Sequence, residues 1–145
     1  MALHLALAAA AIAAQPADYG IAPVAPGSWT YVAVPGGSEA RFIDSGGTAR
    51  LMIHCTRMSR QVNISHTSTI AAPSLLLWTS SASRTVAARF EANAMRVTAD
   101  FSAFDPLLDA LAFSRGRLVV MLAGGAPLVV PAWPEAARTI EDCRI

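Results

Sequence analysis

Residues 113–145 read FSRGRLVVMLAGGAPLVVPAWPEAARTIEDCRI, and this stretch decides how the C-terminus is attached to the rest of the domain. Its apolar runs at 118–122 and 128–130 flank the turn Ala-Gly-Gly-Ala and predict a β-hairpin. Pro134 then opens a final helix, because proline is favoured at the first helical position. We expect the buried line of this helix to hold Trp133, Ala136 or Ala137, Ile140 and Cys143.

The final helix also carries the second of the two cysteines in the chain. Cys55 lies 88 residues upstream of Cys143, in a segment with the alternation of a strand. Two cysteines in an exported chain favour one structural disulfide, and free or reactive thiols are the alternative. In the chain-entropy model such a link stabilises the fold by about 4–5 kcal/mol, comparable to the whole stability of a small domain.

Export is indicated by the first 14 residues, MALHLALAAAAIAA, which are uncharged, apolar and end in small residues. The pattern predicts a signal peptide at 1–14, cleaved after Ala13 or Ala14. Because its only basic candidate is His4, a misassigned start and a buried N-terminal helix remain alternatives. The run is too short to span a bilayer, so no transmembrane anchor is expected after cleavage. We therefore expect an irregular segment at 15–27, one β-rich domain at 28–145, and a periplasmic or secreted location.

Residues 49–55 have the cleanest alternation in the chain. Ala49, Leu51, Ile53 and Cys55 share one face, and the intervening polar residues and Met52 share the other. The segment 61–66 repeats the pattern and is expected to pair with 49–55 as a hairpin. Further strands are predicted at 28–34, 40–44, 75–79, 84–91, 94–101, 118–122 and 128–130.

One earlier helix interrupts the strands. Asp105 is a good N-cap, Pro106 occupies the first helical position, and an apolar stripe leads to Gly116 as a stop. The total is nine short strands and two short helices. Strands that follow one another as hairpins make a parallel sheet improbable. We expect a mainly β fold, a single antiparallel β-sandwich or curved sheet with two short helices, the second C-terminal.

No catalytic, cofactor-binding or metal site is assigned from the sequence. His54, Cys55 and His66 invite a metal-site interpretation, but His54 and Cys55 are strand neighbours and point to opposite faces. At most the two histidines could meet across the hairpin, and surface polar residues are the default interpretation. The chain has no Gly-x-Ser-x-Gly motif, and it has no lysine for a Ser-x-x-Lys motif. Its three Gly-Gly pairs fit hairpin turns. None of them precedes a helix, as a phosphate-binding loop would.

The charge distribution suggests one candidate surface for binding a partner. All eleven basic residues are arginines, and the segment 39–96 carries a local excess of positive charge, whereas the last third is acidic. A basic face of Arg50, His54, Arg57 and Arg60 is a candidate for binding an anionic partner, such as lipopolysaccharide or an acidic protein. The alternative is a solvated face with ordinary ion pairs. No nucleic-acid partner is expected from a net charge of +1.

A set of short motifs distinguishes the C-terminal third. These are Asp105-Pro106, Phe113-Ser114-Arg115-Gly116-Arg117, Pro131 with Trp133-Pro134-Glu135, and Glu141-Asp142-Cys143-Arg144. In these motifs the chain resembles the C-terminus of small, uncharacterised exported proteins of alphaproteobacteria. The resemblance covers about 40 residues and implies no activity. The strand pattern is also faintly similar to that of periplasmic β-sandwiches of the invasion-associated-locus-B type, from which no function is carried over.

These observations predict an exported, non-enzymatic β-rich domain that binds or supports a component of the cell envelope. The first alternative is a periplasmic inhibitor of a lysozyme or a protease, acting through a protruding loop at 56–60 or 123–127. The second is a hydrolase of unrecognised type, which requires a cleft that gathers Asp, His or Ser from distant segments.

Overall fold

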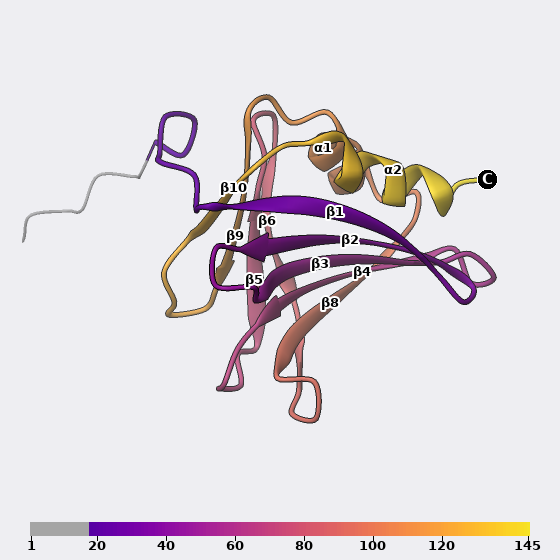
Figure 1. Cartoon of the computed structure of the whole chain (residues 1–145), viewed down its shortest axis with the longest axis horizontal. Helices are drawn as coiled ribbons and strands as arrows, with labels where there is room; N and C mark the ends of the chain where they lie inside the picture. The colour runs from indigo at the N-terminus through magenta and orange to yellow at the C-terminus, as the bar shows by residue number, and fades with distance from the viewer. Residues whose placement is uncertain (1–17) are drawn as a thin grey trace, which may run out of the picture.

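The computed structural model describes residues 18–145 and shows two antiparallel sheets with two helices (Figure 1). The fold is therefore the predicted mainly β fold, with a short C-terminal helix. The predicted signal peptide at 1–14 and the following residues 15–17 lie outside the described residues. Neither of the two helices within 18–145 is long and apolar enough to cross a membrane.

The larger sheet has six strands in the order β1-β2-β3-β4-β8-β7, all paired antiparallel. Its strands are β1 (Gly27–Val34), β2 (Gly37–Asp44), β3 (Ala49–Thr56), β4 (Gln61–Thr67), β8 (Arg96–Ser102) and β7 (Arg89–Glu91). The predicted hairpin of 49–55 with 61–66 is confirmed, because Ile53 pairs with Ile64 at its centre.

The smaller sheet has four strands in the order β10-β9-β5-β6. They are β10 (Leu128–Pro131), β9 (Arg117–Leu122), β5 (Ser74–Trp78) and β6 (Ser83–Ala87). The predicted hairpin around Ala-Gly-Gly-Ala is confirmed as the pair β9 and β10. The sheets meet at one side, where the Ala25 amide donates to Val129 at 2.8 Å and the Trp29 indole donates to Pro131 at 2.7 Å.

The predicted single strand at 84–91 is wrong, because the chain changes sheets within it. Residues 83–87 pair with β5 in the smaller sheet, whereas 89–91 pair with β8 in the larger one. Ala88 lies at the crossing, where its amide donates to the Pro73 carbonyl at 2.9 Å. A continuous alternation therefore covers two strands that belong to different layers.

One hydrophobic core lies between the layers. The alternate side chains that face it from the larger sheet are each at most 1% exposed: Ala40, Phe42, Leu51, Ile53, Val62, Ile64, Val97 and Ala99. Leu75 and Leu77 of β5 and Ile140 of the last helix complete the same cluster. Each large apolar side chain buried here contributes about 1.5–3 kcal/mol, which makes this cluster the main source of stability.

The two helices are α1 (Pro106–Ala112) and α2 (Pro134–Asp142). Asp105 caps α1 as predicted, since its carboxylate accepts from the Leu107 amide at 2.8 Å. The helix ends at Ala112, earlier than the predicted stop at Gly116. Helix α2 packs on β1, β2, β3 and α1.

The buried line of α2 was predicted correctly for Ala136, Ile140 and Cys143 but wrongly for Trp133. Trp133 is 43% exposed, because it precedes the helix in an extended conformation, with φ −92° and ψ 162°. It therefore does not share the helical spacing of the residues that follow. Thr139, which the sequence did not single out, takes a place in the core instead.

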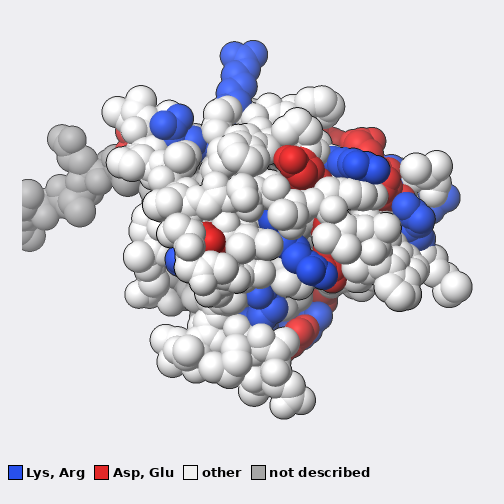
Figure 2. Space-filling model, in the orientation of Figure 1, with Lys and Arg blue, Asp and Glu red and all other residues white. Residues whose placement is uncertain are grey.

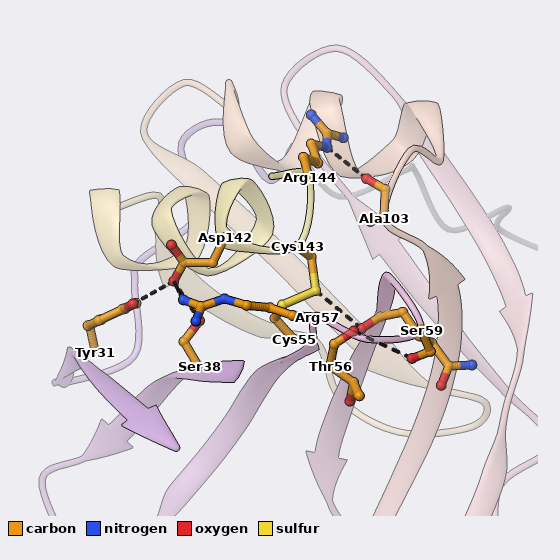
Figure 3. The surroundings of a disulfide bond; sticks show 11 residues. Tyr31, Ser38, Cys55, Thr56, Arg57, Ser59, Ala103, Asp142, Cys143 and Arg144 are labelled. Atoms are coloured by element: carbon orange, nitrogen blue, oxygen red, sulfur yellow. Dashed lines mark hydrogen bonds and ion pairs between the residues drawn. A yellow bond between two sulfur atoms is a disulfide. The ribbon is translucent and has the colours of Figure 1, made fainter. Parts of the chain in front are cut away.

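A covalent link fastens α2 to the larger sheet (Figure 3). The predicted disulfide between Cys55 and Cys143 is confirmed, with Cα atoms 5.6 Å apart. Beside it, the Asp142 carboxylate accepts hydrogen bonds from Tyr31 and Ser38. Burial alone would raise the pKa of Asp142, but these bonds and two nearby arginines outweigh it and lower the pKa below its ordinary value.

The turn between β1 and β2 brings the backbone close to this link. Gly36 has φ +77°, in the left-handed region that favours glycine. A Cβ on Gly37 would lie 1.7 Å from the Cys55 carbonyl oxygen, so only glycine fits there. The Arg57 amide also donates to the Gly36 carbonyl at 3.0 Å. The β1–β2 and β3–β4 turns therefore lie side by side.

Candidate ligand-binding cleft

A polar cleft opens on the face of the larger sheet that points away from the core. Its volume is about 240 Å³. It is lined by Glu39, Met52, His54, Asn63, Ser65, Arg89, Glu91, Ala94, Arg96 and Thr98. These residues come from β2, β3, β4, β7, β8 and the β7–β8 turn.

The shape of the sheet creates this cleft. Glu39 on β2 and Glu91 on β7 line the same space, although three strands lie between them. On a flat sheet four strand spacings would separate them by about 19 Å. The sheet therefore curves around the cleft, and this curvature brings together residues that are far apart in the sequence.

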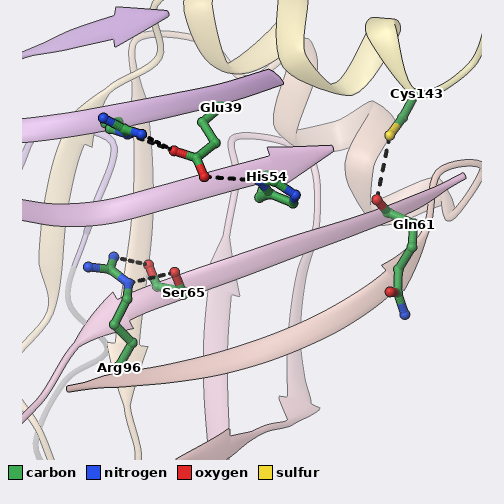
Figure 4. A network of polar contacts seen from close by, with 7 residues as sticks. Glu39, His54, Gln61, Ser65, Arg96 and Cys143 are labelled. Carbon is green, nitrogen blue, oxygen red and sulfur yellow. Dashed lines mark hydrogen bonds and ion pairs between the residues drawn. The ribbon is translucent and has the colours of Figure 1, made fainter. Parts of the chain in front are cut away.

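Arg96 forms the base of the cleft and is only 9% exposed. Its Nε donates to the Ser65 hydroxyl at 2.8 Å, and one terminal nitrogen donates to the Ser65 carbonyl at 3.0 Å (Figure 4). The other terminal nitrogen donates to the Ala49 carbonyl at 3.0 Å. All three acceptors are neutral. Among residues 18–145, no carboxylate lies within ion-pair distance of this guanidinium.

Burial lowers the pKa of Arg96 below its ordinary value, and the more distant charges of Glu39 and Glu91 oppose this effect. A buried charge without a close partner of opposite sign is costly. An anionic group that entered the cleft would supply the missing partner.

One wall of the cleft is built on Glu39. Its carboxylate accepts from the Arg41 guanidinium and lies 3.0 Å from Nδ1 of His54. The contact between Glu39 and His54 is drawn in Figure 4. Burial alone would raise the pKa of Glu39, but the bonds from Arg41 and His54 lower it below its ordinary value. Glu39 is therefore a fixed negative charge that orients the His54 ring.

The opposite wall is built on Arg89, which pairs with Glu91 at 3.0 Å and also with Asp100. The bond to Asp100 raises the pKa of Arg89. Beyond Arg89 a second hollow of about 280 Å³ continues along β8, lined also by Ala87, Ala88 and Thr98. Arg89 and Thr98 thus line both depressions.

The charges of the cleft lining balance. Arg89 and Arg96 oppose Glu39 and Glu91, and His54, Asn63, Ser65 and Thr98 add further hydrogen-bonding groups. The view in Figure 2 likewise shows basic and acidic side chains adjacent to one another, without a large area of one sign. A ligand that suits this lining combines an anionic group for Arg96 with polar groups for the walls.

The four residues of the predicted basic face lie in two separate parts of the structure. Arg50 and His54 share the exposed face of β3, where each lies beside a carboxylate: Asp44 at 3.7 Å and Glu39 at 3.0 Å. Arg57 and Arg60 lie in the β3–β4 turn. The Arg57 side chain approaches Asp142 at 3.9 Å, on the α2 side of the sheet. Only His54 of the four lines the cleft.

The predicted surface position of His66 is wrong. His66 is 7% exposed and lies opposite Leu51, because it continues the inward alternation of Val62 and Ile64. Burial lowers its pKa below the ordinary value. His54 and Cys55 do point to opposite faces, and no group of three His, Cys, Asp or Glu side chains within 18–145 is arranged to hold a metal ion.

Sequence reasoning missed the most distinctive residue of the site, Arg96. Arg96 alternates along β8 with the core residues Val97 and Ala99, so it lies on the outward face, where side chains are normally exposed. The available signal was the register: with β4 paired to β8, Arg96 lies diagonally across from Ser65. The curvature that buries both side chains has no local sequence pattern.

Comparison of the chain with protein-family models, with curated proteins and with solved structures finds no match.

Proposed function

We propose that this protein is an exported, non-enzymatic binding domain that takes an anionic group of a cell-envelope component into the cleft on its larger sheet. The observation that carries the proposal is Arg96, a buried guanidinium bonded only to neutral oxygens. A carboxylate or phosphate, as acidic envelope polysaccharides and lipopolysaccharide carry, is the complementary group.

Export is supported by two features of the chain. The apolar sequence at 1–14 has the composition of a signal peptide. The link between Cys55 and Cys143 is of the kind that persists in oxidising compartments. A periplasmic or secreted location follows from this proposal.

A binding role is favoured over hydrolysis by the geometry around Ser65 and His54. Both residues line the cleft, but Ser65 is bonded to Arg96, whereas His54 is bonded to Glu39. An activated serine requires a hydrogen bond to its general base. Within residues 18–145 the two side chains make no such bond to each other.

The test is a titration of the mature protein with galacturonate, inorganic phosphate and purified lipopolysaccharide, followed by NMR and calorimetry. We expect saturable binding of at least one of them, with shifts in the amide signals of Ser65 and Arg96. Arg96→Gln should weaken that binding about tenfold or more, because it removes a charge-assisted bond. Arg115→Gln, which removes an exposed arginine of the α1–β9 loop, is the matched control and should bind normally.

Thermal melting of both variants separates lost binding from lost folding. Arg96→Lys is a second variant, which keeps the charge but not the planar fork of donors. The proposal fails if a folded Arg96→Gln protein binds as tightly as the wild type. It also fails if none of the three probes binds.

Enzyme inhibition is a second candidate function, because the structure contains an ordered, protruding turn. Residues 57–60 connect β3 to β4, and Met58 at their centre is 99% exposed. The turn is closed by a bond from the Arg60 amide to the Arg57 carbonyl at 3.1 Å. Assays of lysozyme and of serine proteases with the mature protein test this function directly.

A further inference from the structure

A second surface, separate from the cleft, lies at the end of the larger sheet. We define the basic tip as Arg57, Met58, Arg60 and Phe104. Met58 is 99% exposed and Phe104 is 54% exposed. The Arg60 guanidinium lies 5.8 Å from the centre of the Phe104 ring, and the Ala103 amide donates to the Arg60 carbonyl at 2.9 Å. The four residues therefore form one surface, although 44 positions separate Arg60 from Phe104.

The basic tip is held rigidly. Arg57 follows Cys55 by two positions, so the disulfide anchors the strand from which the turn projects. The Arg57 amide is bonded to the Gly36 carbonyl of the neighbouring turn at 3.0 Å. Arg60 adopts φ +50°, a conformation that glycine or asparagine would take at lower cost. The exposed methionine is thus presented by a fixed turn.

The positive charge of the basic tip is poorly compensated. Among residues 18–145, Arg60 has no carboxylate within ion-pair distance, and the nearest for Arg57 is Asp142 at 3.9 Å. Asp142 already accepts hydrogen bonds from Tyr31 and Ser38. The tip therefore combines one arginine without an ion pair, Arg60, and one weakly paired arginine, Arg57, with two exposed apolar side chains.

A complementary surface must be negatively charged at its outside and apolar within. An anionic lipid bilayer has this profile, because its headgroups attract arginine and its acyl region accepts apolar side chains. An acidic protein surface would pair with the arginines, but it would also need a pocket for Met58. The charge and the exposed apolar groups together favour the bilayer.

We propose that the basic tip docks this protein onto an anionic lipid bilayer. Met58 and Phe104 enter the headgroup region, and Arg57 and Arg60 bind lipid phosphates. In Figure 1 the β3–β4 turn projects from the right-hand end of the molecule. The cleft is lined by none of the four tip residues. The cleft therefore stays open when the tip is docked.

The test is flotation of the mature protein with vesicles of phosphatidylcholine alone and with added phosphatidylglycerol. We expect binding only to the vesicles that contain phosphatidylglycerol, and release on addition of salt. Arg57→Gln with Arg60→Gln should weaken binding about 25-fold, since each arginine near such a surface contributes roughly fivefold. Met58→Ser should weaken it about fivefold, because an apolar group no longer enters the interface.

The matched control is Met95→Ser, which changes an exposed methionine in the β7–β8 turn, at the opposite end of the sheet. It should bind as the wild type does, and melting curves should show that all variants are folded. Absence of binding to either vesicle type overturns the proposal, and so does equal binding to both. An equal loss in Met95→Ser and Met58→Ser overturns it as well. If the tip variants lose inhibition of a lysozyme or protease while vesicles never bind, the tip is a protein-binding surface instead.

Discussion

At the scale of single residues, two arginines on neighbouring strands have very different surroundings. Arg89 is exposed and pairs with two carboxylates, whereas Arg96, on the adjacent strand, is buried among neutral oxygens. A surface ion pair such as that of Arg89 is worth little. The buried guanidinium carries an uncompensated electrostatic cost, and that difference identifies the candidate site.

His66 makes the stability of the fold depend on pH. Its pKa is lowered from 6.5 by burial, so in the unfolded chain the imidazole takes up a proton at a higher pH than in the folded protein. Stability should therefore be unaffected by this group above about pH 6.5 and should fall as the pH decreases below it. Urea unfolding of the wild type and of His66→Gln between pH 7.5 and pH 5 measures the effect.

His66→Gln should flatten the decline in unfolding free energy over this range. The slope against pH is the readout, since the substitution itself changes packing and shifts the absolute value. Identical slopes for the two proteins would contradict the assignment of the decline to His66.

At the scale of elements, helix α2 depends on contacts with strands that are distant in the sequence. The disulfide joins it to β3, Asp142 joins it to β1 and β2, and Arg144, just after it, donates to the Ala103 carbonyl at 2.7 Å. With only nine residues, the helix would be marginal in isolation. The helix therefore depends on its contacts with the sheet for its stability.

Replacing Cys143 with serine tests this dependence. Cys143→Ser should lower the free energy of unfolding by about 4–5 kcal/mol, because the unfolded chain regains the entropy of an 88-residue loop. The far-ultraviolet circular dichroism should keep its β signature, since the core cluster is unchanged. The double variant Cys55→Ser with Cys143→Ser removes the remaining thiol as a control. An unchanged midpoint in urea would show that the link does not constrain the unfolded chain.

The elements also show what the sequence could predict. Strands such as β3 and β4 were predicted correctly because one face of each is buried, which forces alternation. The division of 84–91 was missed because both halves alternate and nothing local marks the change of sheet at Ala88. Trp133 was misplaced because helical spacing was extended to a residue that precedes the helix. The cleft depends on register and curvature, which are properties of several strands together.

At the scale of the whole molecule, the two proposed surfaces are independent. The cleft lies on the face of the larger sheet, and the basic tip lies at its end. A docked protein could therefore present its cleft to a ligand beside the bilayer. Loss of one function with retention of the other, through Arg96→Gln or Met58→Ser, would show this independence.

Intact-mass measurement tests the proposed export. The protein recovered from the periplasm or the medium should lack the first 13 or 14 residues and should weigh two hydrogens less than the reduced chain. A chain that keeps residues 1–14 and has two alkylatable thiols would contradict both the location and the link in the cell.

The 88-residue separation of the two cysteines also sets the delay between their syntheses on the ribosome. At about 5–20 residues per second, ribosomes make Cys143 roughly 4–18 seconds after Cys55. During that interval β3 is complete and its thiol has no native partner. The growing chain is then open to mixed disulfides with other molecules, so oxidation that starts too early would trap it. Productive folding of this domain therefore requires that the link form after α2 has been made.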